Sequence, residues 1–344
     1  DPDLLEILPD EIRERDYGCG DPSRHVQPGD TVLDLGCGGG KICYMAAQLA
    51  GPEGEVIGID MNDDMLALAR KYQPEMEVRL GGCKVRFLKG YIEDLALDLE
   101  AMSAWLKDNP VHTPEDLARL EAWSARQRRE APLVADESVD LVISNCVLNL
   151  VDEARKPELF REIFRVLRPG GRIAISDIVS DSPVPEHLKK DPALWSGCIS
   201  GSLDEESFIG AFVDAGFAAV NIEGFDERPW QVVDDIEFRS VTITAIKPEA
   251  GECLDYGHAV IYRGPFSEVR DDEGHVYPRG ARIAVCERTY RQLMGSAYRD
   301  AFIGIAPPDD DREPATFCQP AGTRRSPQET RRGVVHGGAE GCCC

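Results

Sequence analysis

Thr31-Val-Leu-Asp-Leu-Gly-Cys-Gly-Gly-Gly40 is an apolar run that ends in a cluster of glycines, and Lys41–Ala50 follows it with apolar residues at helical spacing. This order predicts a buried strand, a tight turn and a helix. Glycines in the turn let the backbone bend sharply and let a ligand approach the N-terminus of the helix. A second apolar run, Glu55–Asp60, ends in a carboxylate about 20 residues after the turn, the offset at which nucleotide-binding α/β units place an acid against ribose hydroxyls. Together the two runs predict a nucleoside-binding α/β domain.

The acid just before the glycines indicates which kind of nucleoside the domain binds. A dinucleotide fold carries the pattern G-x-G-x-x-G, whereas this turn reads G-C-G-G-G and is preceded by Asp34. A carboxylate at that place would repel a pyrophosphate but suits a cation or an amino group. The stretch from Val32 to Gly38 resembles the first motif of class I S-adenosylmethionine methyltransferases. The resemblance implies a cofactor with a sulfonium and an α-amino group and no phosphate.

The composition excludes several classes of function. Asp and Glu outnumber Lys and Arg by 62 to 38, which gives a formal charge of -24 and argues against unaided binding to nucleic acid. No apolar run approaches the roughly 20 residues needed to cross a bilayer, and the first residues lack the features of a signal peptide. We therefore expect a cytoplasmic protein with no nucleic-acid partner and no membrane contact.

The pattern of the chain predicts a class I methyltransferase-like (Rossmann-like) α/β fold, a doubly wound, mostly parallel sheet, over residues 28–248. Residues 1–27 form an N-terminal segment with the loop of Cys19. Within the main domain, residues 95–135 are too long for an ordinary connection and predict a helical insertion. Residues 249–306 read as a small α+β domain. Residues 307–344, with little to bury and a Cys-Cys-Cys end, predict a disordered tail.

Two details of the main domain concern the ends of its elements. A helix is expected over residues 153–167, ending before the turn at 168–171. At the exit of the third strand, either Glu93 or Asp94 could accept a hydrogen bond from an adenine amino group. A solvated acid at the start of a helix is the alternative for either one.

The 12 cysteines do not suggest a disulfide framework, because a chain with this much core needs none and the cytosol keeps thiols reduced. Cys146 follows the fourth strand, and Cys198 lies between glycine-containing turns, repeating the exposed setting of Cys19. Thiolates bind soft, thiophilic ions. Two or three convergent thiolates would hold a trivalent metalloid with its lone pair free to attack a sulfonium methyl group, so that catalysis would rest mainly on positioning.

Six short motifs resemble the arsenite (As(III)) S-adenosylmethionine methyltransferases, in the same order and over most of residues 9 to 290. They are Tyr17-Gly-Cys-Gly20, Gly58-Ile-Asp-Met61, Gly90-Tyr-Ile-Glu93, Ser144-Asn-Cys-Val147, Trp195-Ser-Gly-Cys198 and Phe238-Arg-Ser-Val241. The resemblance implies that Cys19 and Cys198 bind arsenic. The cofactor positions that it implies are Asp34, Gly36, Asp60, Met61 and Glu93. The predicted cofactor site also includes Cys37, Gly38, Ile92 and Asn145.

The chain departs from that family at two cysteines. The family often has a cysteine just before the Phe-x-Ser motif, where this chain has Ile236, and another upstream of the motif around Cys19. The third arsenic ligand would then be a glutathione-type thiol, a further cysteine such as Cys146, or absent. Cys146, counted among the predicted catalytic residues, could equally be a wall of the pocket.

The resemblance implies methyl transfer from S-adenosylmethionine to cysteine-bound arsenite, in arsenic detoxification. A thiol reductant of the glutathione or thioredoxin type would be a co-substrate, and a thiol-reducing protein is the partner to consider. One alternative keeps the cofactor and changes the acceptor to an organoarsenical, a selenium compound or an organic thiol. Another is a non-catalytic metalloid-sequestering protein, against which the intact cofactor motifs weigh.

Overall fold

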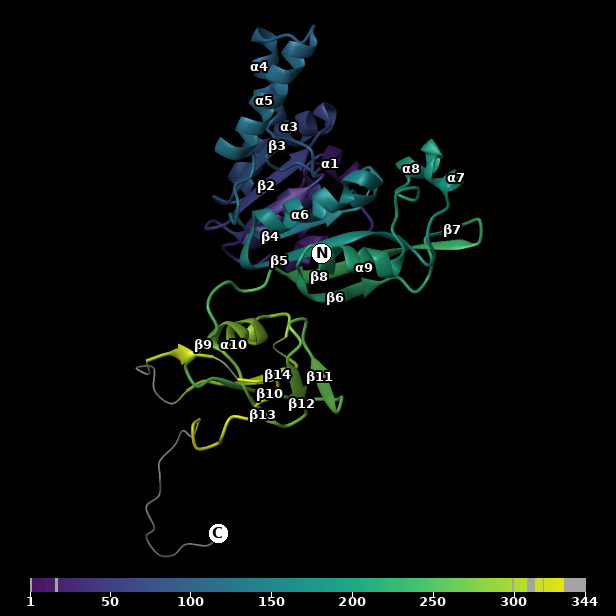
Figure 1. The fold of residues 1–344 in the computed structure, drawn as a ribbon. Helices are drawn as coiled ribbons and strands as arrows, with labels where there is room; N and C mark the ends of the chain where they lie inside the picture. The colour runs from purple at the N-terminus through teal and green to yellow at the C-terminus, as the bar shows by residue number, and fades with distance from the viewer. Residues whose placement is uncertain (1, 16–17, 299, 308–312, 318, 331–344) are drawn as a thin grey trace, which may run out of the picture. The chain divides into compact units, whose positions relative to one another are not determined.

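The computed structural model describes residues 2–15, 18–298, 300–307, 313–317 and 319–330 (Figure 1). Its contacts divide the chain into two units, Asp1–Pro248 and Glu249–Cys344. Each unit has its own apolar core, and each is described by itself.

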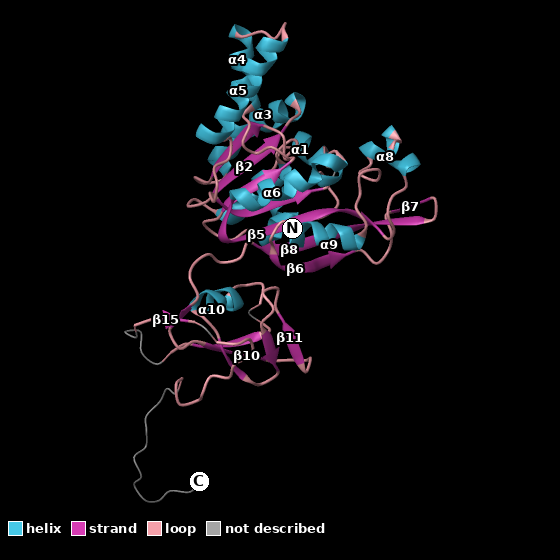
Figure 2. Cartoon of the chain, in the orientation of Figure 1, coloured by secondary structure: helices cyan, strands magenta, loops and turns pink. Residues whose placement is uncertain are grey.

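The first unit is built on one sheet, drawn in magenta in Figure 2. Its strand order is β3-β2-β1-β4-β5-β8-β6, and β7 also pairs with β8. The strands are β1 (Thr31–Leu35), β2 (Glu55–Asp60), β3 (Lys84–Lys89), β4 (Val139–Asn145), β5 (Leu167–Ser180), β6 (Ala218–Phe225), β7 (Gln231–Val233) and β8 (Ile236–Ile246). The pairs from β3 to β5 are parallel, and β8 is antiparallel to its neighbours. The predicted doubly wound sheet is confirmed. Its order reverses between β1 and β4, where sheets of this kind bind ligands at the carboxyl ends of their strands.

Helices cover both faces of the sheet because successive side chains of a strand point to opposite sides. In β1, Val32 joins the core beneath α2 and α3, whereas Leu33 joins the core beneath α6 and α9. The α-helices of this unit are α1 (Asp10–Glu14), α2 (Lys41–Ala50), α3 (Asp63–Arg79), α4 (Leu99–Asp108), α5 (Pro114–Glu130), α6 (Lys156–Val166), α7 (Glu186–Lys189), α8 (Pro192–Ser196) and α9 (Glu205–Asp214). Four 3-10 turns are Pro2–Leu5, Pro22–His25, Leu148–Leu150 and Glu153–Arg155.

The helix predicted over residues 153–167 is shorter than expected. It begins as a 3-10 turn and ends at Val166, because β5 starts at Leu167. The stretch at 168–171 is part of that strand. Gly170 N donates to the carbonyl of Lys247 (2.9 Å) and Lys247 N donates to the carbonyl of Gly171 (2.8 Å), so the stretch pairs with the chain after β8, while Gly170 keeps a positive φ of 75° and the register with β4 shifts here.

The stretch at 95–135 contains two helices, α4 and α5. Asp98 caps the first through the N–H groups of Glu100 and Ala101, and Thr113 forms a capping box with Asp116 at the start of the second. The helices are joined by stacked indoles of Trp105 and Trp123, whose centroids lie 5.5 Å apart.

The described residues of the second unit form short antiparallel strand pairs and one helix. Its elements are β9 (Leu254–Asp255), β10 (Ala259–Tyr262), β11 (Glu268–Arg270), β12 (Val276–Pro278), β13 (Arg282–Ala284), α10 (Glu287–Met294), β14 (Phe302–Ile305) and β15 (Ala315–Thr316). Within the segment that begins at residue 307, the structure describes residues 313–317 and 319–330. β15 pairs with β9, and Arg325 forms a 2.6 Å ion pair with Asp255, contacts that a local sequence pattern does not reveal. The terminal Cys-Cys-Cys lies outside the described residues.

Across the described residues, no helix combines the length and the apolar character needed to span a bilayer.

Candidate active site

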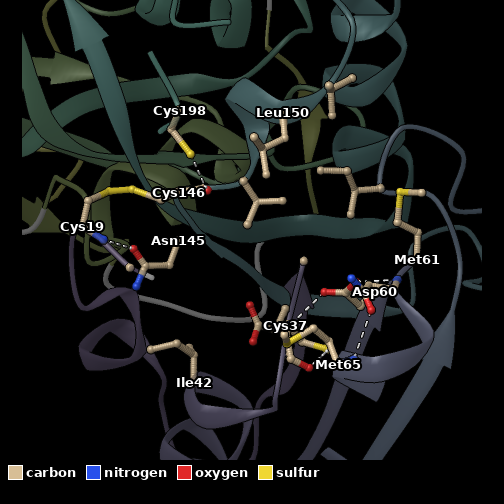
Figure 3. A pocket seen from close by; sticks show the side chains of 18 of the residues that line it. Cys19, Cys37, Ile42, Asp60, Met61, Met65, Asn145, Cys146, Leu150 and Cys198 are labelled. Atoms are coloured by element: carbon tan, nitrogen blue, oxygen red, sulfur yellow. Dashed lines mark hydrogen bonds between the residues drawn. A yellow bond between two sulfur atoms is a disulfide. The ribbon is translucent and has the colours of Figure 1, made fainter. Parts of the chain in front are cut away.

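A cavity of about 880 Å³ opens at the carboxyl ends of the central strands of the first unit (Figure 3). Of the residues that the sequence analysis named for a site, all but Asp94, the alternative to Glu93, line it: Cys19, Asp34, Gly36, Cys37, Gly38, Asp60, Met61, Ile92, Glu93, Asn145, Cys146 and Cys198. Figure 3 shows Cys19, Cys146 and Cys198 on one side and Asp60, Met61 and Met65 on the other. The cavity therefore has a sulfur-rich side and a side formed by the glycine-rich turn and the end of β2.

The first residues of the glycine-rich turn are held against their neighbours. Gly36 has φ 68°, and a Cβ there would lie 2.4 Å from Val147 Cγ1, so neither the backbone angle nor the space admits a side chain. The N–H groups of Gly36 and Cys37 donate to the carbonyl of Ile59 at 2.8 and 2.9 Å. The turn is thereby fixed beside the end of β2.

Asp34 is a buried acid that faces this cavity. Its Oδ2 accepts a hydrogen bond from the thiol of Cys43 (3.1 Å), a weak donor. Burial, together with the nearby charge of Asp60, raises the pKa of Asp34 to about 7. A ligand that placed a positive charge here would relieve the cost of the buried carboxylate, so the site fits a cofactor with an amino or sulfonium cation.

Asp60 is oriented by the backbone around it. Its Oδ2 accepts from Gly38 N (2.9 Å) and its Oδ1 accepts from Asn62 N (2.8 Å). Each carboxylate oxygen keeps a further lone pair, which suits it to accept from a ribose hydroxyl. Met61, beside it, is 59% exposed and offers an apolar surface to a flat ring.

The two acids after β3 have different surroundings. Glu93 lines the cavity, and its Oε1 lies 3.8 Å from Nε of Arg155. Asp94 instead accepts from both Nε (3.1 Å) and Nη2 (2.7 Å) of Arg128, on α5. Asp94 thus ties the helical insertion to the sheet, and Glu93 is the acid available to a ligand.

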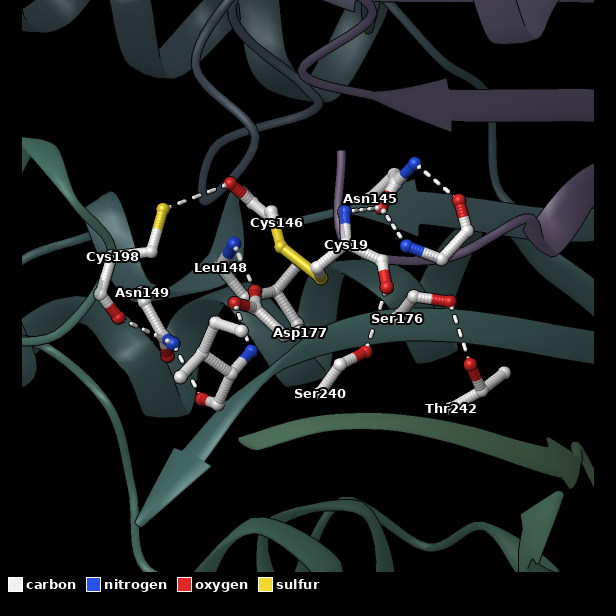
Figure 4. Close-up of a disulfide and its surroundings, with 12 residues drawn as sticks. Cys19, Asn145, Cys146, Leu148, Asn149, Ser176, Asp177, Cys198, Ser240 and Thr242 are labelled. Atoms are coloured by element: carbon white, nitrogen blue, oxygen red, sulfur yellow. Dashed lines mark hydrogen bonds between the residues drawn. A yellow bond between two sulfur atoms is a disulfide. The ribbon is translucent and has the colours of Figure 1, made fainter. Parts of the chain in front are cut away.

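The sulfur-rich side departs from what the sequence indicated. Cys19 and Cys146 form a disulfide with their Cα atoms 5.9 Å apart, whereas the sequence favoured reduced thiols throughout (Figure 4). The thiol of Cys198 donates to the carbonyl of Cys146 at 3.2 Å. The three sulfur-bearing residues are therefore neighbours, although they come from distant parts of the chain.

The end of β4 brings these cysteines together. Asn145 Oδ1 accepts from the N–H groups of Cys19 (2.9 Å) and Gly20 (3.1 Å), and its Nδ2 donates to the carbonyl of Gly20 (2.8 Å). Asn149 Nδ2 donates to the carbonyl of Cys198 (3.1 Å). The side-chain amide predicted to bind the cofactor is thus engaged with the Cys19 loop.

The glycines beside Cys19 also allow its loop to approach the sheet closely. A Cβ on Gly18 would lie 2.2 Å from Asn145 Nδ2, and one on Gly20 would lie 2.4 Å from Ser176 Oγ. The sequence indicated only an exposed setting for Cys19. In the structure the glycines let the loop lie against β4 and β5.

Cys198 is half-buried, although the sequence suggested an exposed thiol. Burial and the nearby carboxyl of Asp177 raise the pKa of Cys198 to about 12, and the ammonium of Lys156 opposes that rise. Lys156 is itself buried and donates to the carbonyl of Gly201. Cys198 is therefore a protonated thiol near neutral pH until a ligand replaces its proton.

Several residues of the site escaped the sequence analysis. Asn149 and Lys156 sit in segments without a motif, and only the fold brings them to Cys198. Ser240, whose hydroxyl donates to the carbonyl of Cys19 (2.8 Å), lies within the Phe-x-Ser motif and could have been named from it. Ile236 packs on the same apolar cluster as the three cysteines, so no thiol reaches the site from that position.

The comparisons with known proteins agree with this geometry. A family model described as a methyltransferase domain matches residues 27–119 and 124–222, more than half of the chain. An arsenite methyltransferase from Aquipseudomonas alcaligenes is 32% identical over 87% of this chain and 80% of its own length. The chain belongs to the arsenite methyltransferase family.

Two further members of the arsenite methyltransferase family show how far the likeness extends. One from Halobacterium salinarum is 37% identical over 67% of this chain, which spans 50% of that protein. The crystal structure of an arsenic(III) S-adenosylmethionine methyltransferase from Chlamydomonas reinhardtii matches with a TM-score of 0.59 and 27% identity, covering 91% of this chain and 97% of that one. A second family model, described as a domain of unknown function, matches residues 249–335.

The role of Asn145 in this family member can be tested by hydrogen exchange. Asn145→Ala is expected to speed exchange of the Cys19 and Gly20 amides by about fivefold, since each loses a hydrogen bond worth about 1 kcal/mol. Mass spectrometry of residues 18–20 measures the effect. Asn149→Ala, which removes the bond to Cys198 instead, is the matched control and should leave these two amides unchanged. Equal exchange in both variants would show that Asn145 does not hold the loop.

Proposed function

We propose that this chain transfers methyl groups from S-adenosylmethionine to trivalent arsenic held by the thiolates of Cys19, Cys146 and Cys198. The observation that carries the proposal is the grouping of these three sulfur-bearing residues on one side of a single cavity, with the glycine-rich turn and Asp60 on the other. Thiolates are the protein ligands that bind a soft ion such as trivalent arsenic most strongly.

The cofactor would be held by residues already oriented in the cavity. Asp34 would face the cationic end, Asp60 would accept from the ribose hydroxyls, and Met61 and Ile92 would enclose the adenine, with Glu93 near its amino group. When bound, S-adenosylmethionine supplies an electrophilic methyl group. Trivalent arsenic carries its own lone pair, so the protein needs to position it and exclude water and does not need a strong base.

The disulfide implies that a reductant acts before arsenic binds. Two of the three sulfurs are joined to each other, and among the described residues no group of three or more Cys, His, Asp or Glu side chains is arranged to hold a metal ion. A thiol reductant of the glutathione or thioredoxin type would supply two electrons and two protons, giving the thiols of Cys19 and Cys146. Such thiols persist in the cytoplasm, where we expect the reaction to occur.

The test is a methylation assay with the full chain. Reduced protein, arsenite and methyl-labelled S-adenosylmethionine are expected to give methylated arsenic, separated by chromatography and detected by its label. Protein oxidised at Cys19 and Cys146 should give none until a thiol reductant is added. Parallel reactions with selenite and with an organic thiol test the alternative acceptors. Product from one of these and none from arsenite would assign the methyl transfer to another acceptor.

A further inference from the structure

The second unit contains a pair of cysteines, Cys253 and Cys286, that the methyltransferase site does not use. β9, which follows Cys253, packs against α10, which Cys286 caps, so the two thiols lie close enough to affect each other's ionisation although they are 33 positions apart, at residues 253 and 286. Both carry free thiols, unlike the Cys19–Cys146 pair. This dithiol pair, Cys253 and Cys286, is therefore available to a ligand.

Cys286 forms the N-cap of α10. Its sulfur accepts from Thr289 N (3.4 Å) and lies 3.2 Å from Thr289 Oγ1. Burial opposes ionisation of Cys286, but the hydrogen bonds with Thr289, the neighbouring Cys253 and the guanidinium of Arg288 together outweigh it, so its pKa is lowered. A sulfur held this way is prepared to act as a thiolate ligand.

A reagent in solvent can reach the dithiol pair through Cys253. Cys253 is exposed, whereas Cys286 is buried, so a small reagent can reach the pair from one side. Its backbone is fixed, because its carbonyl accepts from Phe317 N (2.8 Å) and the next residues form β9, paired with β15. The position of the exposed sulfur beside the buried one is thus set by the packing of β9 and α10.

No other pair of thiols in the described part of the chain combines these features. Cys37 and Cys43 are also in contact, but both are buried beneath the glycine-rich turn. Cys83 is buried, and its thiol donates to the carbonyl of Gly54 at 3.5 Å. The dithiol pair is the one with both a prepared thiolate and an open side.

We propose that Cys253 and Cys286 form a second binding site, which takes a monosubstituted trivalent arsenical, R–As(OH)2. Two As–S bonds form and two As–O bonds break. The two thiol protons leave with the two hydroxides as water, and no atom changes oxidation state. Two thiols complete the coordination of such an arsenical, whereas unsubstituted arsenite keeps one hydroxide. The choice of an arsenical over another thiophilic ligand rests on the function proposed above.

The test counts arsenicals bound to the full-length chain. In the background variant, the other thiols outside the buried core are replaced by serine: Cys19, Cys146, Cys198, Cys318, Cys342, Cys343 and Cys344. The protein is reduced and desalted, phenylarsine oxide is added as the probe, and native mass spectrometry measures the number of phenylarsenic groups per chain. One group per chain is expected.

Adding Cys253→Ser or Cys286→Ser to the background should lower the bound fraction at least tenfold. Serine keeps the N-cap of α10, and a thermal melt checks that each variant folds. Cys83→Ser, which removes a thiol that is not part of the pair, is the matched control and should still bind one group. Binding that survives Cys286→Ser, or no binding in the background variant, would overturn the site.

A separate assay keeps this proposal distinct from the methyltransferase function. Cys253→Ser/Cys286→Ser in the otherwise unchanged chain is tested for methylation of arsenite, alongside the unchanged chain. If the unchanged chain methylates no arsenic while the background variant binds the probe, the proposed function fails and the second site stands. If methylation is observed but the background variant binds no probe, only the second site fails.

Discussion

Cys198→Ser is expected to slow methylation of arsenic by about 100-fold or more while leaving the affinity for S-adenosylmethionine within about twofold. A serine hydroxyl fits the space of the thiol but is a hard ligand that does not replace a thiolate on trivalent arsenic. Single-turnover formation of methylated arsenic measures the rate, and calorimetry with S-adenosylmethionine measures the binding.

The effect of Cys198→Ser is easier to interpret than that of Cys19→Ser, because Cys198 does not take part in the disulfide. Cys19→Ser should cause a similar loss and should also free Cys146, which thiol titration would detect. Cys83→Ser is the control, since Cys83 is a buried thiol away from the cavity lining. Full activity in both Cys19→Ser and Cys198→Ser would refute binding of arsenic by these sulfurs, even if the reaction itself were confirmed.

The affinity for S-adenosylmethionine is expected to rise with pH between about 5.5 and 8 because of Asp34. Burial raises the pKa of this carboxyl to about 7, so it is mostly neutral below that pH and ionised above it. Only the ionised form attracts the cationic cofactor. The association constant should therefore rise by up to about tenfold per pH unit below pH 7 and level off above it.

Asp34→Asn is the control for that pH dependence. The amide has nearly the same shape but no charge, so binding should be weak and nearly independent of pH over this range. Calorimetry at four or five pH values compares the two proteins. Asp60 also faces the cavity, and Asp60→Asn should weaken binding but keep the rise with pH, moved to lower pH because the charge of Asp60 contributes to the raised pKa of Asp34. A rise that persists in Asp34→Asn would mean that another group titrates.

The main domain could be predicted from sequence because its signals are local. Alternating strands and helices, the glycines at 36 to 40 and the acid that ends β2 are each readable within a short window. The predicted cofactor residues line one cavity because residues at the carboxyl ends of parallel strands meet at the same edge of the sheet. Errors arose where pairing extends an element, as in β5, which takes in the residues that looked like a turn.

The arrangement of the sulfurs could not be predicted in the same way. Cys19 and Cys146 are separated by 127 positions, and what joins them is the side-chain amide of Asn145 and the absence of a side chain at Gly18. The placement of residues 313–317 and 319–330 likewise depends on contacts with β9 and Asp255, which lie far upstream in the sequence.

By itself, the sequence determined that this chain forms a class I methyltransferase sheet and which residues stand at the ends of its strands. Backbone angles and the alternation of apolar residues act between near neighbours, so a short stretch records them. The tertiary structure decided which thiols meet: Cys19 with Cys146, Cys198 beside them, and Cys253 with Cys286. Such contacts arise only when distant segments pack together, and the free energy of that packing is spread over many residues that no local pattern contains.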